Sequence, residues 1–294
     1  MKDHVTREKK QPDSDEIEVV GYRPEDVIHC LPKPELDLTN YVPDPDKICP
    51  KTNLLTPWGP SIWFVDGPIV SFYGYSYSTR MVVVSLSQGG GSLIWSPIPL
   101  SNELANEIEG RAGGVRHIVA PNMYHNRNLK EWSDRYPLAK IHAAPGLPER
   151  EGVGSEDLIF DFLLTDDIHR DLSLDLDQVL FRGSYCDEAV LYHRLSGTII
   201  FADLIQRHYE CNCTGMYGEM MRLNGVVGEQ GGTPKPWRLS FWWNGNKKKA
   251  QNALHVILDR WKPKMMIVAH GENSTEGATD LVANALSWMT TSDI

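Results

Sequence analysis

Three residues of metal-ligand type stand shortly after short apolar segments of this sequence: His125, Asp203 and His270. The apolar segments that precede them are 117–120, 198–202 and 265–269. Imidazole and carboxylate groups are common protein ligands of zinc, iron and manganese. Three such groups can hold one ion and leave a position open for water, which the ion activates as a nucleophile. We therefore predict metal ligands at these three positions.

A fourth residue, Glu188, opens a further apolar segment and could serve as a ligand or a general base. We predict catalytic roles for Glu188 and Asp203, although an exposed carboxylate at a strand end and a simple cap for Asp203 are the alternatives. Asn122 and Asn126 are turn formers on this interpretation. Four histidines inside predicted strands or helices are interpreted as structural: His117, His142, His193 and His255.

Apolar periodicity predicts the elements that must position these residues. The predicted strands are 61–65, 69–75, 80–87, 93–96, 117–120, 140–143, 178–181, 188–194, 198–202 and 265–269. The predicted helices are 103–109, 129–135, the end of 210–223, 247–261 and 277–289. Asp66-Gly67 is a turn signal between the first two strands, and 88–92 is a glycine-rich hairpin loop. The Trp-rich stretch 237–243 is interpreted as core or loop packing, or alternatively as the wall of a substrate pocket.

This order of elements fits neither a repeated β-α unit nor an all-β protein. We predict an α+β fold, an αββα sandwich in which helices flank two mixed β-sheets. With its ligand-bearing turns, the order resembles the metallo-β-lactamase fold. The segments NLLTPWGPSIWFVDGP, GGGSLIWSPIPLS, HIVAPNMYHNRNLKEW, YPLAKIHAAPGL and GTIIFADLI resemble a family of that superfamily with a degenerate metal motif, over roughly 53–290.

The resemblance implies a metal site, and the sequence departs from the usual one. The superfamily motif is H-x-H-x-D-H after a strand, whereas this turn reads P-N-M-Y-H-N-R-N and keeps one histidine, His125. The third-histidine region reads GSYCDEAV, and the bridging aspartate and final histidine are matched by Asp203 and His270. We expect at most one ion, a zinc with iron or manganese as alternatives, or no metal at all.

Composition narrows the function classes. The chain has 294 residues, a formal net charge of −10 and five cysteines. An acidic chain is a poor match for nucleic acid, and no apolar run is long enough for a membrane span. Few cysteines in a long chain indicate a reducing compartment, so we expect a cytoplasmic protein. We interpret the C-x-C pair at 211–213 as structural, with thiol redox chemistry as a weaker alternative.

We divide the chain into a Pro-rich, acidic, extended arm at 1–50 and a metallo-β-lactamase-like domain at 51–294. Our first hypothesis is a metal-dependent hydrolase-like protein that acts on a small-molecule substrate. The alternative is a non-catalytic binding or scaffold protein on the same fold, because the metal motif is incomplete. In that case the N-terminal arm is the candidate surface for a protein partner.

Overall fold

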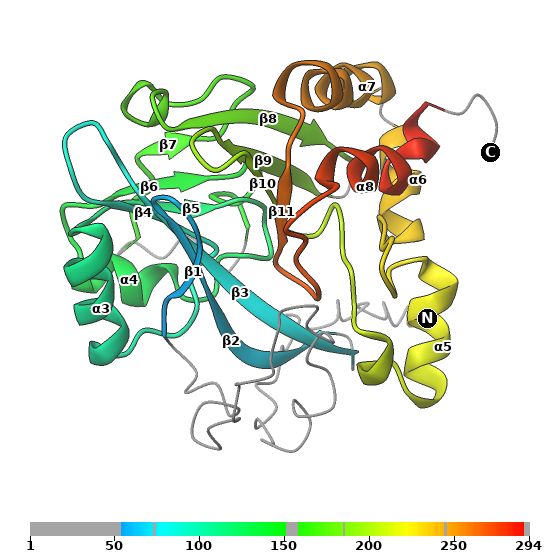
Figure 1. Cartoon of the computed structure of the whole chain (residues 1–294), viewed down its shortest axis with the longest axis horizontal. Helices are drawn as coiled ribbons and strands as arrows, with labels where there is room; N and C mark the ends of the chain where they lie inside the picture. The colour runs from blue at the N-terminus through cyan, green and yellow to red at the C-terminus, as the bar shows by residue number, and fades with distance from the viewer. Residues whose placement is uncertain (1–53, 73–74, 151–157, 185, 244–245, 291–294) are drawn as a thin grey trace, which may run out of the picture.

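A computed structural model describes residues 54–72, 75–150, 158–184, 186–243 and 246–290. The predicted arm at 1–50 lies outside the described residues, as do the ends of the predicted domain. The described part contains a seven-stranded and a four-stranded sheet with helices on their outer faces (Figure 1). The predicted sandwich of two mixed sheets is confirmed.

The larger sheet follows the order of the chain, β1 to β7. Its strands are β1 Thr56–Gly59, β2 Ile62–Phe72, β3 Tyr75–Ser85, β4 Ser92–Trp95, β5 Val115–Ala120, β6 Lys140–Ala143 and β7 Phe162–Leu163. The first four strands pair antiparallel, and β4 to β7 pair parallel. The carboxyl ends of β4 and β5 therefore meet at one edge, and the turn that carries His125 begins there.

The smaller sheet has the order β11-β10-β9-β8. Its strands are β8 Leu176–Arg182, β9 Asp187–His193, β10 Thr198–Phe201 and β11 Met265–Val268. Strands β10 and β11 are parallel neighbours, with Phe201 opposite Val268. This pairing brings the residues after both strands, Asp203 and His270, to the same edge.

Three apolar layers hold the sandwich together, because alternate residues of each strand face opposite sides. Helices α3 Asn102–Ala112 and α4 Leu129–Arg135 pack on the outer face of the larger sheet. Residues such as Trp95, Val119, Leu191 and Ile267 fill the space between the sheets. The outer face of the smaller sheet is covered by α6 Lys235–Trp243, α7 Lys247–His255 and α8 Ala278–Ala285.

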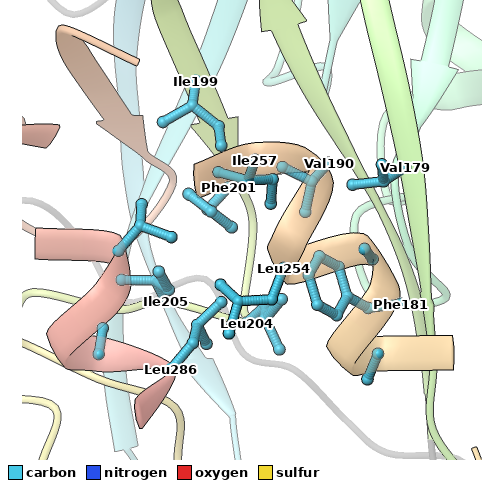
Figure 2. Close-up of a cluster of buried hydrophobic side chains, with 14 of the residues drawn as sticks. Val179, Phe181, Val190, Ile199, Phe201, Leu204, Ile205, Leu254, Ile257 and Leu286 are labelled. Carbon is cyan, nitrogen blue, oxygen red and sulfur yellow. The ribbon is translucent and has the colours of Figure 1, made fainter. Parts of the chain in front are cut away.

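Figure 2 shows this last layer, in which Phe181, Val190 and Phe201 of the sheet meet Leu254 and Ile257. Leu254 belongs to α7, and Ile257 to the π-helix Val256–Trp261 that continues it. The closing helix α8 is followed by the 3₁₀ turn Ser287–Met289, and two further 3₁₀ turns span Arg170–Leu172 and Glu210–Asn212. Helix α5, Gly215–Asn224, contributes Met221 to a separate small cluster with Cys213 and Val226.

One local prediction was wrong. Asp66-Gly67 is not a hairpin turn, because β2 runs through it and pairs with β3, with Asp66 opposite Arg80. A register shift after Gly67 marks a bulge instead, a common role of glycine inside a strand. The segment 237–243, predicted to pack in the core or to anchor a loop, is helical within α6, and its Trp237 and Phe241 do lie in the core.

Candidate metal centre

The structure brings the three predicted metal ligands together. One ligand atom from each of His125, Asp203 and His270 lies within 4.8 Å of the others. Nε2 of His125 is 3.2 Å from Oδ2 of Asp203, and Nε2 of His270 is 3.0 Å from Oδ1 of the same carboxylate. Burial alone would raise the pKa of Asp203, but the two imidazoles hold that pKa well below its usual range. The carboxylate is therefore ionised, as a metal ligand must be.

The far nitrogens of both imidazoles have partners of their own. Nδ1 of His270 lies 2.6 Å from the backbone carbonyl of Ser78, which can only accept, so Nδ1 carries a proton and Nε2, which faces Asp203, is the nitrogen that can bind a metal. Nδ1 of His125 lies 2.6 Å from the hydroxyl of Ser96. Such outer contacts fix the tautomer and orientation of metal-binding histidines. Two oriented imidazoles and one carboxylate are thus a donor set that fits a single zinc, iron or manganese ion.

Asn122 organises the turn after β5. Its Oδ1 accepts hydrogen bonds from the backbone N–H groups of Tyr124 and His125, at 2.9 and 3.1 Å. Its Nδ2 donates to Oδ2 of Asp203 at 2.7 Å and to Glu188 at 3.2 Å. The amide is therefore a turn former, as predicted, and it also fixes the orientation of the Asp203 carboxylate. Asn126 donates to the carbonyl of Met123, which is a turn contact alone.

Glu188 lies beside the three ligands and is fully buried in β9. Its carboxylate accepts the backbone N–H groups of Ala202, Asp203 and Leu204 at 2.9, 2.7 and 3.1 Å. Burial, followed by repulsion from Asp203, raises the pKa of Glu188 to about 7. It is not one of the clustered ligand residues, and it holds the backbone of the segment that carries Asp203.

Close backbone contacts hold the Asp203 and His270 segments side by side. Arg207 N–H donates to the carbonyl of His270 at 3.0 Å, and Glu272 N–H donates to the carbonyl of Arg207 at 2.8 Å. Gly271 between them has a φ of 102°, and a Cβ there would lie 1.9 Å from the Arg207 carbonyl oxygen. Only glycine fits at position 271, because the backbone of Arg207 lies too close for a Cβ atom.

Arg80 fastens the same region to the larger sheet. Its guanidinium is buried and donates to the carbonyls of Val268 and Gly271 and to Asn273, across the two sheets. Its Nε also pairs with Asp66 at 2.8 Å. The sequence analysis did not single out Arg80, Ser78 or Ser96, because their partners are far away in sequence. The signal for Ser96 was its position at the end of a strand beside a Gly-rich hairpin.

The three ligands lie on the wall of a cavity of about 730 Å³. Ser96, Gln206 and Tyr77 line it close to the ligands, and α5 and α6 supply much of its apolar wall, including Met221 and Trp237. Trp237, in the Trp-rich stretch, thus contributes to both the core and the cavity. A cavity of this size suits a small-molecule ligand.

The other histidines discussed in the sequence analysis lie away from the ligand cluster, and His208 lies behind it. His117 and His142 contact each other at 2.9 Å between Nδ1 and Nε2, and burial lowers their pKa values to about 4 and about 3. His193 is buried against Ser196, and His255 contacts Asp259 on the surface. His208, which the sequence analysis did not weigh, stacks against His270 with ring centroids 6.3 Å apart. Apart from His255 on the surface, these histidines are buried rings whose pKa burial lowers, and they are structural.

Cys213 is a free, buried thiol in the α5 cluster, and Cys186 is a free, buried thiol on the cavity wall. Burial raises the pKa of both thiols, which makes them poor nucleophiles. Within the described residues, no helix is both long and apolar enough to cross a membrane.

No protein-family model matches the sequence, and no curated protein matches it. Solved structures do match. A metallo-β-lactamase from Hirschia baltica aligns with a TM-score of 0.53 at 12% identity, over 80% of this chain and 97% of its own. The metallo-β-lactamase from Pontibacter korlensis gives 0.52 at 13% identity, over 81% and 99%. The DIM-1 enzyme exposed to ceftazidime gives 0.52 at 12%, over 82% and 97%.

These identities are too low to carry activity from one chain to another, since one fold serves many functions. The alignments span nearly the whole length of each solved structure, so the likeness includes both sheets and their flanking helices. This chain therefore has the metallo-β-lactamase fold.

Proposed function

We propose that this chain is a metal-dependent hydrolase with a single metal ion. The observation that supports this most strongly is the convergence of three ligand atoms, two imidazole and one carboxylate, on the wall of a large cavity. Catalytic zinc sites commonly use three protein ligands and leave the fourth position for water. A bound ion would lower the pKa of that water and polarise the bond to be cleaved.

We assign the other roles to individual residues of this chain. His125, Asp203 and His270 hold the ion, which we assign as zinc, with iron and manganese compatible with the same ligands. Asp203 also lines the cavity, where its predicted catalytic role is that of a ligand beside the substrate. Glu188, which we first considered as a ligand or base, acts on Asp203 through the backbone that it holds. The Asn122 amide donates to the carboxylates of both Asp203 and Glu188. Because an amide N–H group stands between these two carboxylates, the arrangement favours one bound ion over two.

Metal content tests this proposal directly. We expect close to one ion per chain in the full-length protein after reconstitution, and none after Asp203→Ala or His270→Ala. His255→Ala is the matched control, because that histidine is on the surface and outside the cluster. A wild-type protein that takes up no zinc, iron or manganese would refute the proposal and favour a non-catalytic binding protein on the same fold.

One observation favours a second candidate, a metal-free hydrolase that uses a serine. Ser96 Oγ, His125 and the Asp203 carboxylate form a continuous relay, with contacts of 2.6 and 3.2 Å on opposite sides of the ring. A serine, a base and an orienting carboxylate in this order are the parts of an activated nucleophile. A fluorophosphonate probe that labels Ser96 in chelated protein would support this candidate. No labelling would exclude it and leave Ser96 as a contact that orients His125.

We also propose that this protein is cytoplasmic and that its segment 1–50 binds a protein partner. Both proposals rest on the composition of the sequence alone. The full chain should recover that partner in a pull-down, and a chain starting at residue 53 should not. Equal recovery by both chains would place the partner site elsewhere.

A further inference from the structure

We propose that the cavity beside the metal centre accepts carboxylic esters with a long hydrocarbon acyl chain. This inference rests on the hydrolase proposed above and adds its substrate class. The cavity volume of about 730 Å³ exceeds the space that a metal ion and its bound water would occupy at the ligand cluster. Sites of this size enclose most of the surface of a small organic molecule. The chemistry of the walls decides which kind of molecule that is.

Much of the cavity wall outside the ligand cluster is apolar. Helices α5 and α6 contribute Met220, Met221, Trp237 and Leu239, and Val70 and Ile98 come from the larger sheet and the loop after it. The indole N–H of Trp237 is already used, because it donates to the carbonyl of Cys186 at 3.2 Å. Methionine side chains adapt to flexible apolar ligands. Each methylene group of a chain buried here gains about 0.8 kcal/mol, which is about fourfold in affinity.

Charged groups on the cavity wall are few. Apart from the histidines, Arg127 is the one cationic residue among the described residues that line it, and Asp203 is the one carboxylate. Phosphate esters carry their charge at the reacting atom and need several cations around it. An uncharged ester needs none, and the overall charge of −10 also disfavours anionic substrates.

Two polar groups of the cavity wall contact the ligand cluster directly, although Asn224 of α5 and Ser240 of α6 also line the cavity. Ser96 contacts His125, and Gln206 donates to Oδ1 of Asp203 at 3.1 Å. The acyl carbon of the ester therefore belongs at this end, with its hydrocarbon chain along α5 and α6. In the reaction, water adds to the acyl carbon and the C–O bond breaks. The leaving alkoxide takes a proton from that water, which gives one carboxylic acid and one alcohol.

Chain-length dependence tests the inference. We would measure kcat/KM of the reconstituted full-length protein for p-nitrophenyl acetate, butyrate and octanoate, and for the acidic hemisuccinate ester. We expect octanoate to exceed acetate by at least about thirtyfold, since several methylene groups become buried at about fourfold each. Leu239→Glu places a charge on the cavity wall and should reduce the octanoate-to-acetate ratio by about tenfold or more.

Leu223→Glu is the matched control, because Leu223 is an exposed leucine of α5 that does not line the cavity. It should leave the ratio unchanged. Equal rates for acetate and octanoate, or a preference for the hemisuccinate, would overturn the substrate class while the hydrolase stands.

A binding measurement separates the two proposals. Decanamide, which has an apolar chain but no ester bond, should bind both the wild type and Asp203→Ala, and should bind Leu239→Glu at least about tenfold more weakly. If no ester is cleaved but decanamide binds in this pattern, the apolar ligand class stands and the hydrolase fails. If decanamide does not bind the wild type, the apolar site is refuted.

Discussion

Ser96 contacts His125 at the candidate metal centre. Its hydroxyl lies 2.6 Å from Nδ1, on the side of the ring opposite the Nε2 that faces Asp203. Its backbone adopts a φ of 54°, which is unfavourable for a residue with a Cβ. A hydrogen bond from Ser96 N–H to the carbonyl of Val119 at 2.9 Å holds that conformation. Strain retained at such a point is common at functional sites.

Ser96→Ala should weaken metal binding by about 10- to 100-fold, because outer partners of metal-binding histidines contribute that much. Competition with a chromophoric zinc chelator measures the affinity. Ser101→Ala is the control, since Ser101 caps α3 through the N–H of Leu104 and should cost about 1 kcal/mol of stability but no affinity. Unchanged zinc affinity in Ser96→Ala would show that Ser96 does not orient His125 for metal.

Glu188→Gln separates a positioning role from a catalytic one. The amide oxygen can replace the oxygen that accepts from Asp203 and Leu204, whereas the new NH₂ group would face the N–H of Ala202. We expect a loss of about 1–3 kcal/mol in the free energy of unfolding. The variant should still bind the metal.

Activity completes this test. A positioning residue should lose little kcat in the folded, metal-loaded variant, and Glu188→Ala should be far less stable, because it leaves three buried N–H groups unpaired. A loss of about 100-fold or more in kcat with metal intact would instead identify Glu188 as a general base.

At this scale the chemical type of His125, Asp203 and His270, and their positions after apolar strands, were enough to select the three residues that the structure brings together. The sequence did not reveal Ser78 and Ser96, since a backbone carbonyl has no signature and a serine at a strand end is ordinary. Their partners, His270 and His125, are 192 and 29 positions away. Such contacts depend on the completed fold.

Elements place the ligands through the pairing of strands. Parallel pairing of β10 with β11 sets Asp203 and His270 at one edge, and the backbone ladder between Arg207 and Gly271 extends that pairing beyond the strands. The N–H of Ala189 in β9 donates to the carbonyl of Pro121 at 2.9 Å, which ties the His125 turn to the smaller sheet. The ligand turns are therefore held by backbone contacts as well as by side chains.

Gly271→Ala should damage the metal centre through the backbone. A Cβ at this position would meet the carbonyl of Arg207 at 1.9 Å, so the His270 segment must move away from the Asp203 segment. We expect a loss of more than about 3 kcal/mol in stability, larger than the roughly 1 kcal/mol of a positive φ alone, together with weaker zinc binding.

Gly277→Ala supplies the comparison, since Gly277 has a φ of 64° and open space around its Cβ position. Gly277→Ala should lower the free energy of unfolding only by the roughly 1 kcal/mol of a positive φ and should leave the zinc affinity unchanged. Equal effects of both substitutions, measured by denaturant unfolding and zinc titration, would contradict the close-approach argument.

Most elements were predictable from apolar periodicity, and α4 and β6 match the expected bounds of 129–135 and 140–143. The β2–β3 pair was not, because Asp66-Gly67 has the composition of a turn. The pairing of Arg80 with Asp66 and with the β11 loop keeps this polar stretch in the sheet. Helix α6 was missed because its aromatic residues favour strands in isolation, while packing of Trp237 and Phe241 on the smaller sheet favours a helix.

On the scale of the whole molecule, the candidate metal centre lies where the two sheets meet. His125 belongs to the turn after β5 of the larger sheet, whereas Asp203 and His270 follow β10 and β11 of the smaller one (Figure 1). Arg80 crosses between the same two sheets. The fold class was predictable as two mixed sheets, but the depth and apolar wall of the cavity depend on how α5 and α6 pack.

A bound ion should therefore stabilise the sandwich as a whole. An ion present at about 100 times its dissociation constant adds about 2.7 kcal/mol to the free energy of unfolding. For a domain of this size that corresponds to a rise of roughly 5 to 10 °C in Tm. Scanning calorimetry with zinc and with a chelator measures it. Asp203→Ala should show no difference between the two conditions, because its carboxylate is the ligand that both imidazoles contact. If chelation left the Tm of the wild type unchanged while metal was removed, the ion would not bridge the sheets, and Arg80 with the core between them would account for their association.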